Sequence, residues 1–359
     1  MSPSSYWPSM VDYQEAVQSP PSAFVSPELR GSKPVMNKLG MPRPICGTFA
    51  SVYELGSGRR RWALKCFLRN TPGLHRRYAE ISNHLKKCRK LKYFATFEYQ
   101  DKGIVVRGQP FPLVKMEWVE GLQLNMFIEQ NLSRRDALEK LKKTWVKVLA
   151  DLRSARIAHG DLQHGNVLVR PNGDLRLIDY DGMWVPALGG EEGNETGHPD
   201  YQDPRRTQKD FHAAIDEFSD AVIQIAICAL ARDGSLWAKY NNGDNLLFRR
   251  RDFLDTQSSP LIADLRKLGD PEINEKLNFV VNACPRPRKA PGKKPVAPRA
   301  PAPAAWLSDY VEGYRGAPGS VSSPRSAPSR GAPVTPNGAA APARNEGIFR
   351  ALLRAIFGP

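Results

Sequence analysis

The chain has 359 residues, of which 41% are hydrophobic and 25% are charged, so a sizeable core is expected and wholesale disorder is excluded. No window approaches 18 uninterrupted apolar residues, which argues against a transmembrane helix, and residues 1–11 lack the features of a secretory signal. The 5 cysteines are scattered and form no CxxC pair. This spacing argues against a disulfide framework or a zinc site and predicts a reducing, cytoplasmic location.

The net charge of +15 is concentrated towards the C-terminus. Residues 285–359 contain 12 Lys and Arg against 3 Asp and Glu, and they hold 14 of the 31 prolines. Such a composition buries too little apolar surface to offset chain entropy, so 285–344 is predicted to be a disordered linker without a specific nucleic-acid motif. Residues 345–359 have apolar side chains at helical spacing. They predict a short amphipathic helix that could dock on its own domain, on a partner or on a membrane surface.

The rest of the chain divides into a leader and a globular region. Residues 1–39 are rich in Ser and Pro and are expected to pack on the domain or to be partly disordered. In residues 40–118 hydrophobic patterning predicts mostly strands, at 49–55, 61–68, 93–99, 103–106 and 112–118, with one helix at 75–90. In residues 119–284 it predicts mostly helices, at 137–154, 216–232 and 271–282. A β-rich front and an α-rich back predict an α+β fold with two lobes and a cleft between them.

Polar residues that could take part in catalysis or bind a metal are concentrated in HGDLQHGN, at 159–166, and DYDG, at 179–182. Between them lie two short strand-like runs joined by an Asn-Gly pair, which is a strong hairpin signal. Such a hairpin would carry Asn166 and Asp179 to one place, where their oxygens suit Mg²⁺. The nearby carboxylate of Asp161 could orient a hydroxyl group and accept its proton.

This order of residues resembles the catalytic loop and metal-binding segment of the protein-kinase-like superfamily, HxDxxxxN followed by DFG. Earlier in the chain, GTFASVY at 47–53 resembles a glycine-rich loop, WALK at 62–65 the strand with the nucleotide-binding lysine, and MEWV at 116–119 the hinge. Later, GHPDYQDP at 197–204 resembles the end of an activation segment, and DEFS at 216–219 the start of the helix that anchors the catalytic loop. The combination is similar to a group of bacterial kinase-like domains.

The resemblance implies a role for each matching residue. Lys65 would bind the nucleotide phosphates and would be oriented by an ion pair with Glu80, 15 residues further on. Asp161 would position the acceptor hydroxyl group, and Asn166 with Asp179 would bind Mg²⁺ or, as the other candidate metal, Mn²⁺. The remaining nucleotide-binding residues implied are Gly47, Val52, Ala63, Met116, Glu117, Trp118 and Leu168.

The activity implied is ATP- and Mg²⁺-dependent phosphoryl transfer to serine or threonine of proteins, this chain included. The implied fold is bilobal, with residues 40–118 as the N-lobe and 119–284 as the C-lobe. The sequence does not identify the protein substrate.

Several residues depart from the protein-kinase pattern. Ile45 and Ala50 replace glycines of the glycine-rich loop, Gly160 and Gln163 replace basic residues of the catalytic loop, and Asp181 replaces the glycine of DFG. Two alternatives therefore stay open. Gly160 and Gln163 favour a small-molecule kinase of the aminoglycoside- and choline-kinase type. The altered glycine loop and the long tail favour a pseudokinase scaffold.

Overall fold

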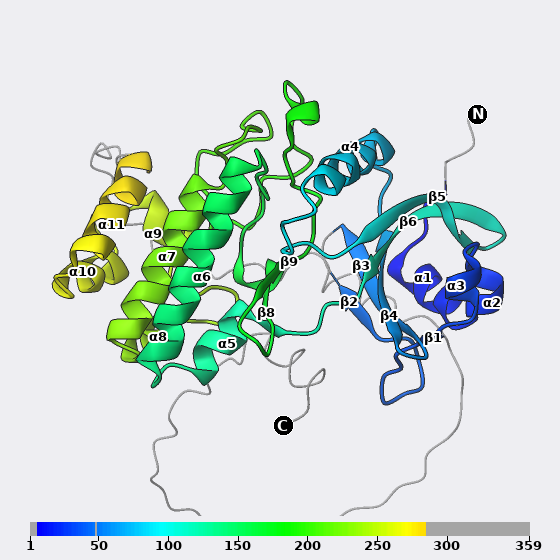
Figure 1. Ribbon diagram of the computed structural model, residues 1–359, viewed down its shortest axis with the longest axis horizontal. Coiled ribbons are helices and arrows are strands. Elements are labelled where there is room, and N and C mark those ends of the chain that lie inside the picture. The colour runs from blue at the N-terminus through cyan, green and yellow to red at the C-terminus, as the bar shows by residue number, and fades with distance from the viewer. Residues whose placement is uncertain (1–5, 47–48, 285–359) are drawn as a thin grey trace, which may run out of the picture. The chain divides into compact units, whose positions relative to one another are not determined.

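The computed structural model describes residues 6–46 and 49–284. The predictions for Gly47, the linker and the C-terminal helix lie outside the described residues. The described part combines antiparallel sheets with α-helices (Figure 1). The predicted α+β class is therefore confirmed.

A sheet of six antiparallel strands dominates the first part of the chain (Figure 1). Its strands are β1 (Lys33–Pro34), β2 (Pro44–Cys46), β3 (Ala50–Ser57), β4 (Arg60–Phe67), β5 (Phe97–Val106) and β6 (Gln109–Glu117). The order is β1-β3-β4-β6-β5, and β2 pairs with β3 outside this path. The strand predicted at 93–99 begins only at Phe97, and it continues into the one predicted at 103–106 to form β5, with an irregularity in its pairing between Gln100 and Ile104. A β-bulge of this kind interrupts the alternation that sequence reading relies on.

The leader packs on one face of this sheet. It forms α1 (Met10–Val17), α2 (Pro20–Ala23) and α3 (Pro27–Arg30). Ser9 begins α1 with a capping box, in which Asp12 accepts a hydrogen bond from the Ser9 backbone at 2.8 Å. The leader and the sheet share a hydrophobic core made of Tyr13, Val17, Phe24, Leu29, Tyr53, Leu55, Leu64, Cys66, Ile104 and Leu113, among others.

The two faces of β4 have different surroundings because side chains alternate along a strand. Leu64 and Cys66 point into the leader core. Ala63 and Lys65 lie on the opposite face, where Lys65 pairs with Val52 of β3 and Val114 of β6. Helix α4 (Leu74–Lys87) follows β4 and packs near β5. Lys65 is thus buried on the face away from the leader.

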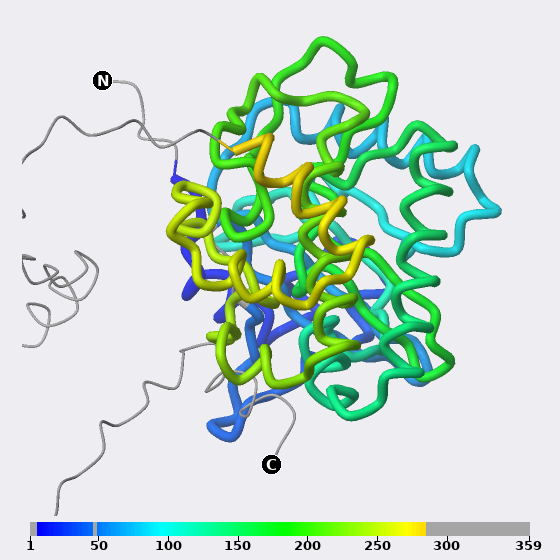
Figure 2. Tube along the Cα trace, turned by 90° about the vertical axis from the view of Figure 1, so that its left-hand side faces the viewer, coloured from blue at the N-terminus to red at the C-terminus, as the bar shows by residue number. Residues whose placement is uncertain are grey.

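The second part of the chain is mostly helical, and a small antiparallel sheet of three strands precedes its central helix. The elements are β7 (Leu122–Gln123), α5 (Leu124–Gln130), α6 (Arg135–Ser154), η1 (His164–Asn166), β8 (Val167–Val169), β9 (Leu175–Leu177), η2 (Pro186–Leu188), α7 (Glu217–Arg232), α8 (Ser235–Tyr240), α9 (Arg250–Leu254), α10 (Pro260–Lys267) and α11 (Pro271–Ala283). Every residue of α7 from 218 to 231 is buried, because α6 and α11 pack against it (Figures 1 and 2). The predicted hairpin is present, with β8 and β9 paired through Val167 and Leu177.

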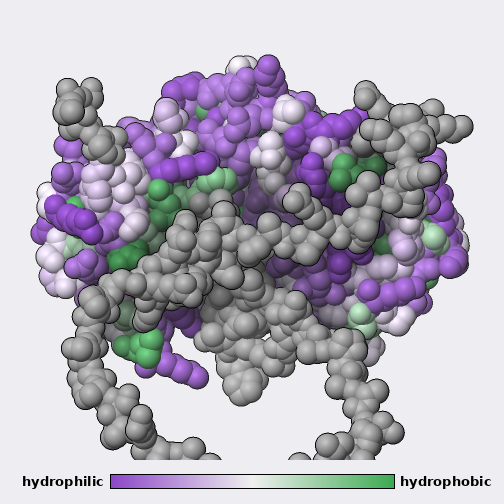
Figure 3. Space-filling view, turned by 180° about the vertical axis from the view of Figure 1, so that it is seen from behind, coloured by the Kyte–Doolittle hydropathy of each residue, from purple (hydrophilic) through white to green (hydrophobic). Residues whose placement is uncertain are grey.

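The face of the molecule in Figure 3 is mostly hydrophilic, with a few small hydrophobic patches. Across the described residues, no helix combines the length and the apolar character needed to cross a membrane.

Candidate functional site

A buried carboxylate binds the backbone of the loop that carries Asp161. Asp216, at the start of α7, accepts hydrogen bonds from the backbone N–H groups of His159 at 2.5 Å and Gly160 at 2.8 Å. The His159 ring is fully buried and bonds the carbonyl of Ile178 at 3.0 Å. The backbones of Ala158 and Trp184 also exchange hydrogen bonds, at 3.1 and 2.8 Å. These contacts fix the loop before Asp161 against the segment that follows Asp179.

Gly160 has a conformation and surroundings that exclude any side chain. Its φ is +81°, and a Cβ placed there would lie 1.9 Å from the carbonyl oxygen of Gly182.

We expect Gly160→Ala to lower the free energy of unfolding by roughly 3–4 kcal/mol, from backbone strain plus this clash. Gly173→Ala is the matched control, because φ there is +86° but the nearest atom to a Cβ is 3.8 Å away. Its cost in a denaturant titration should be only about 1–2 kcal/mol. Equal costs would show that the clash is relieved.

Asp161 is oriented through both of its carboxylate oxygens. One accepts a hydrogen bond from the backbone of His198 at 2.7 Å, and the other from the side-chain amide of Asn166 at 2.8 Å. The same Asn166 amide also donates to the Asp161 carbonyl at 2.9 Å. The structure therefore brings Asp161 and Asn166 together and connects them to the segment 197–204 that follows the DYDG motif.

Asp179 reaches the same site from the end of the β8–β9 hairpin. The backbone of Ile178 donates to the carbonyl of Asn166 at 3.0 Å, which places the two predicted metal-binding residues on neighbouring segments. Asp179 adopts a left-handed backbone conformation, with φ of +66°. A non-glycine residue in this region is uncommon and often marks a functional position.

Lys65 forms ion pairs with two aspartates of the DYDG motif. Its Nζ lies 2.6 Å from Asp179 Oδ1 and 2.6 Å from Asp181 Oδ2. Burial disfavours the charged amine, but the two carboxylates outweigh this effect and raise the pKa of Lys65. Desolvation likewise opposes ionisation of Asp179, yet Lys65 lowers the pKa of that carboxyl group below its ordinary value.

The ion pair expected between Lys65 and Glu80 is not formed. Among the described residues, the ion pairs of Lys65 are those with Asp179 and Asp181. Tyr78 is the residue of α4 that reaches this site, since its hydroxyl group donates to Asp181 Oδ1. Residues two apart on an α-helix point to nearly opposite sides of it, about 160° apart around the axis, so Tyr78 and Glu80 cannot both face Lys65. In this structure, two aspartates of the DYDG motif therefore stand in the place expected for Glu80.

The oxygen donors of the site are compatible with a divalent cation. The amide nitrogen of Asn166 bonds Asp161, so its oxygen is the atom that remains to bind a cation. The Asp179 side chain is 44% exposed and uses only one oxygen for Lys65. Within the described range there is no cluster of three or more His, Cys, Asp or Glu residues suited to a metal. A pair of oxygen ligands is nevertheless typical of Mg²⁺, which retains waters and phosphate oxygens.

Glu195 adds a fourth acidic side chain that the sequence reading did not include. Its Oε1 lies 2.8 Å from the position that a Cβ would take at Gly182. Burial raises the pKa of Glu195 to about 8, and the negative charges of Asp179, Asp161 and Asp181 add to this effect.

The raised pKa of Glu195 predicts a pH-dependent stability. Between its ordinary value of 4.5 and about 8, the folded protein binds more protons than the unfolded chain does. The free energy of unfolding should therefore fall as pH rises from 5 to 9, by on the order of 4 kcal/mol. Glu195→Gln should remove this loss in denaturant titrations without divalent cations. Parallel pH profiles for the variant and the wild type would contradict the assignment.

The residues predicted to surround adenine lie on β3, β4, β6 and β8. Val52 and Ala63 share the sheet face of Lys65. Met116 pairs with Ala63 across β4 and β6 and is 8% exposed. Leu168 is buried on β8 but belongs to neither hydrophobic core, which distinguishes it from its neighbours on that strand.

The backbone of the predicted hinge is partly used within the protein. The N–H of Glu117 donates to Thr96 at 2.9 Å, and that of Trp118 donates to Arg61 at 3.0 Å. The guanidinium of Arg61 also lies 5.2 Å from the centre of the Trp118 ring. These contacts fix the hinge, and any adenine contact there would have to use other backbone groups.

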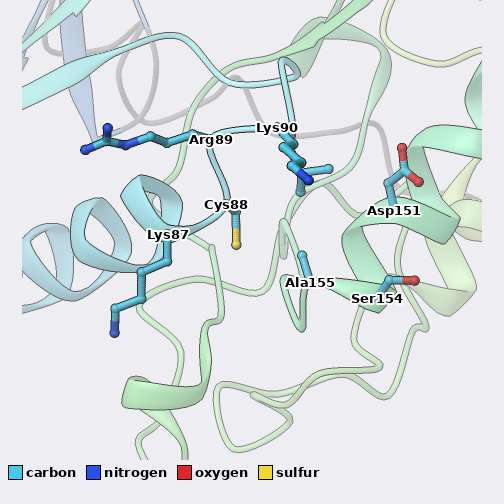
Figure 4. Close-up of a pocket in the computed structure, with 8 residues that line it drawn as sticks. Lys87, Cys88, Arg89, Lys90, Asp151, Ser154 and Ala155 are labelled. Carbon is cyan, nitrogen blue, oxygen red and sulfur yellow. The ribbon is translucent and has the colours of Figure 1, made fainter.

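A surface pocket near the ends of α4 and α6 is separate from this site (Figure 4). It is lined by Lys87, Cys88, Arg89, Lys90, Leu91, Asp151, Ser154 and Ala155. None of the predicted site residues lines it.

Searches for related proteins do not extend this picture, since the chain matches no known protein family and no curated protein sequence.

Proposed function

We propose that this protein is an ATP- and Mg²⁺-dependent phosphotransferase with a two-lobed, protein-kinase-like fold that phosphorylates serine or threonine. The observation that carries the proposal is the meeting of Lys65 with Asp179, across 114 residues of chain, beside the bonded pair of Asp161 and Asn166. A buried amine held at acidic side chains suits a site for a nucleotide triphosphate and its cation.

In this proposal each residue has a distinct task. Lys65 binds phosphate oxygens of the nucleotide, and Asn166 and Asp179 would hold Mg²⁺, which neutralises charge on the transferred phosphoryl group. Asp161 orients the acceptor hydroxyl group and accepts its proton as the new P–O bond forms and ADP departs. The hydrogen bonds from His198 and Asn166 keep the Asp161 carboxylate in place for this task.

A small alcohol or sugar is the second candidate acceptor, and Gly160 favours it. The arginine common at this position of protein kinases cannot be accommodated, because a Cβ there would clash with Gly182. Phosphate analysis after incubation with a lysate or with small alcohols separates the two acceptors.

The nucleotide site can be tested by thermal unfolding with ATP and Mg²⁺. A ligand at 100 times its Kd stabilises the native state by about 2.7 kcal/mol, which corresponds to about 5–10 °C in Tm for a domain of this size. We expect this shift for the wild type with ATP and Mg²⁺ together, and a much smaller one for ATP with a chelator. Lys65→Met should reduce it to a small residual shift.

Two outcomes would contradict the nucleotide site. One is the absence of any shift in the wild type at millimolar ATP and Mg²⁺. The other is a shift of equal size in Lys65→Met, which would place the nucleotide elsewhere on the chain.

A further inference from the structure

Lys65 has a second carboxylate partner that its proposed task does not require. Asp181 Oδ2 lies 2.6 Å from Lys65 Nζ, and the Asp181 side chain is only 14% exposed. A buried carboxylate without a defined task is costly unless it is paired. In the proposed function Asp179 would hold the cation, whereas both carboxylate oxygens of Asp181 are already bonded, one to Lys65 and the other to Tyr78. Asp181 could therefore stay on Lys65 throughout.

The other oxygen of Asp181 is held by Tyr78. The Tyr78 hydroxyl group donates to Asp181 Oδ1, and the Tyr78 residue is 1% exposed. Its ring stacks on Tyr99 at 5.6 Å between centroids and meets Phe97 edge-on at 5.6 Å. Aromatic packing on two sides leaves the ring little freedom, so the hydroxyl group is fixed in space. A continuous path of contacts thus runs from α4 through Tyr78 and Asp181 to Lys65.

We propose that Asp181 is the positioning residue that holds Lys65 towards the nucleotide phosphates, and that Tyr78 acts through Asp181. This pair takes the place of the glutamate that the kinase resemblance assigns to Glu80. The inference rests on the proposed function, because it assumes that Lys65 binds nucleotide. It explains why the DYDG motif carries an aspartate where DFG has glycine, and why α4 presents a tyrosine to the site.

The test is the Kd for ATP with Mg²⁺, measured by calorimetry for Asp181→Asn, Tyr78→Phe and Glu80→Gln. Asp181→Asn should weaken binding about tenfold, and Tyr78→Phe about threefold, with no further loss when the two are combined. Glu80→Gln should change the Kd less than twofold. Asp101→Asn is the matched control, since this carboxylate of β5 pairs with His75 at 3.2 Å and should leave the Kd unchanged.

To distinguish a purely structural role of Asp181 from an action through Lys65, the Asp181→Asn substitution is repeated in the Lys65→Met variant. If Asp181 acts through Lys65, the substitution should not weaken residual binding further in that background. Thermal unfolding without nucleotide checks that each variant is folded. If Asp181→Asn fails to fold, the threefold loss in Tyr78→Phe alone decides.

The outcomes distinguish this inference from the proposed function. Two results would overturn the role of Asp181 while the wild type still binds ATP and Mg²⁺. One is an unchanged Kd in Asp181→Asn, and the other is a loss of affinity in Glu80→Gln as large as that in Asp181→Asn. Both would leave the nucleotide site standing. A further loss from Asp181→Asn in the Lys65→Met background would also overturn the role of Asp181. No binding of ATP and Mg²⁺ by the wild type would overturn both.

Discussion

Asp161→Asn should lower the rate of phosphoryl transfer by about 10²–10⁴-fold while nucleotide binding stays within a few-fold of wild type. The substitution keeps the shape of the side chain but removes its ability to accept the proton of the acceptor hydroxyl group. Lys65 and Asp179, the residues proposed to bind the nucleotide and its cation, are not altered. The measurement is steady-state transfer from labelled ATP, together with the thermal shift that ATP and Mg²⁺ produce.

The contacts of Asp161 define the control for this result. In Asp161→Asn the single side-chain oxygen can accept from the His198 backbone or from the Asn166 amide but not from both, so the new NH₂ group faces one of these two donors. Asp200→Asn alters an exposed contact, in which its carboxylate accepts from the Arg250 backbone at 2.7 Å, and should leave transfer within about twofold. Transfer by Asp161→Asn at more than a tenth of the wild-type rate would contradict the proton-accepting role.

Asp216→Ala should destabilise the protein by roughly 3 kcal/mol and abolish transfer. Asp216 is 7% exposed, and its carboxylate is the acceptor for two backbone N–H groups, those of His159 and Gly160. Each buried donor left unpaired costs about 1–3 kcal/mol. The loop that carries Asp161 would lose its support, so activity should be lost even where the chain stays folded. Denaturant unfolding and transfer assays at low temperature measure both effects.

Glu217→Ala is the matched control for Asp216, because the neighbouring side chain is exposed at the first turn of α7. It should cost less than about 1 kcal/mol, from the lost interaction with the helix dipole, and should leave transfer intact. A small loss of stability in Asp216→Ala, similar to that of Glu217→Ala, would show that the two N–H groups find other partners.

Much of the fold could be predicted from the sequence because its signals are local. The apolar spacing in 137–154 and 216–232 marks α6 and α7, and the Asn-Gly pair marks the β8–β9 hairpin. The leader was harder to predict. Its helices are short, and they form because Tyr13 and Phe24 pack on residues of β3 to β6 that are distant in sequence. Such tertiary contacts leave no periodic pattern.

The grouping of the candidate site residues was predictable from the order of their motifs. Asp161, Asn166 and Asp179 form one group with Lys65 through contacts that the hairpin and the sheet make possible. The partner of Lys65 was not predictable from spacing. Which side of α4 faces the site depends on the rotation of the helix, and packing of Tyr78 against Tyr99 and Phe97 sets it.

The most direct test of the central claim is mass spectrometry of the purified protein, alone and with a lysate, after incubation with labelled ATP. The account predicts phosphate on serine or threonine that requires Mg²⁺ and is absent with a folded Asp179→Asn variant. Equal labelling by Asp179→Asn, or no labelled protein or small molecule with the wild type, would contradict it.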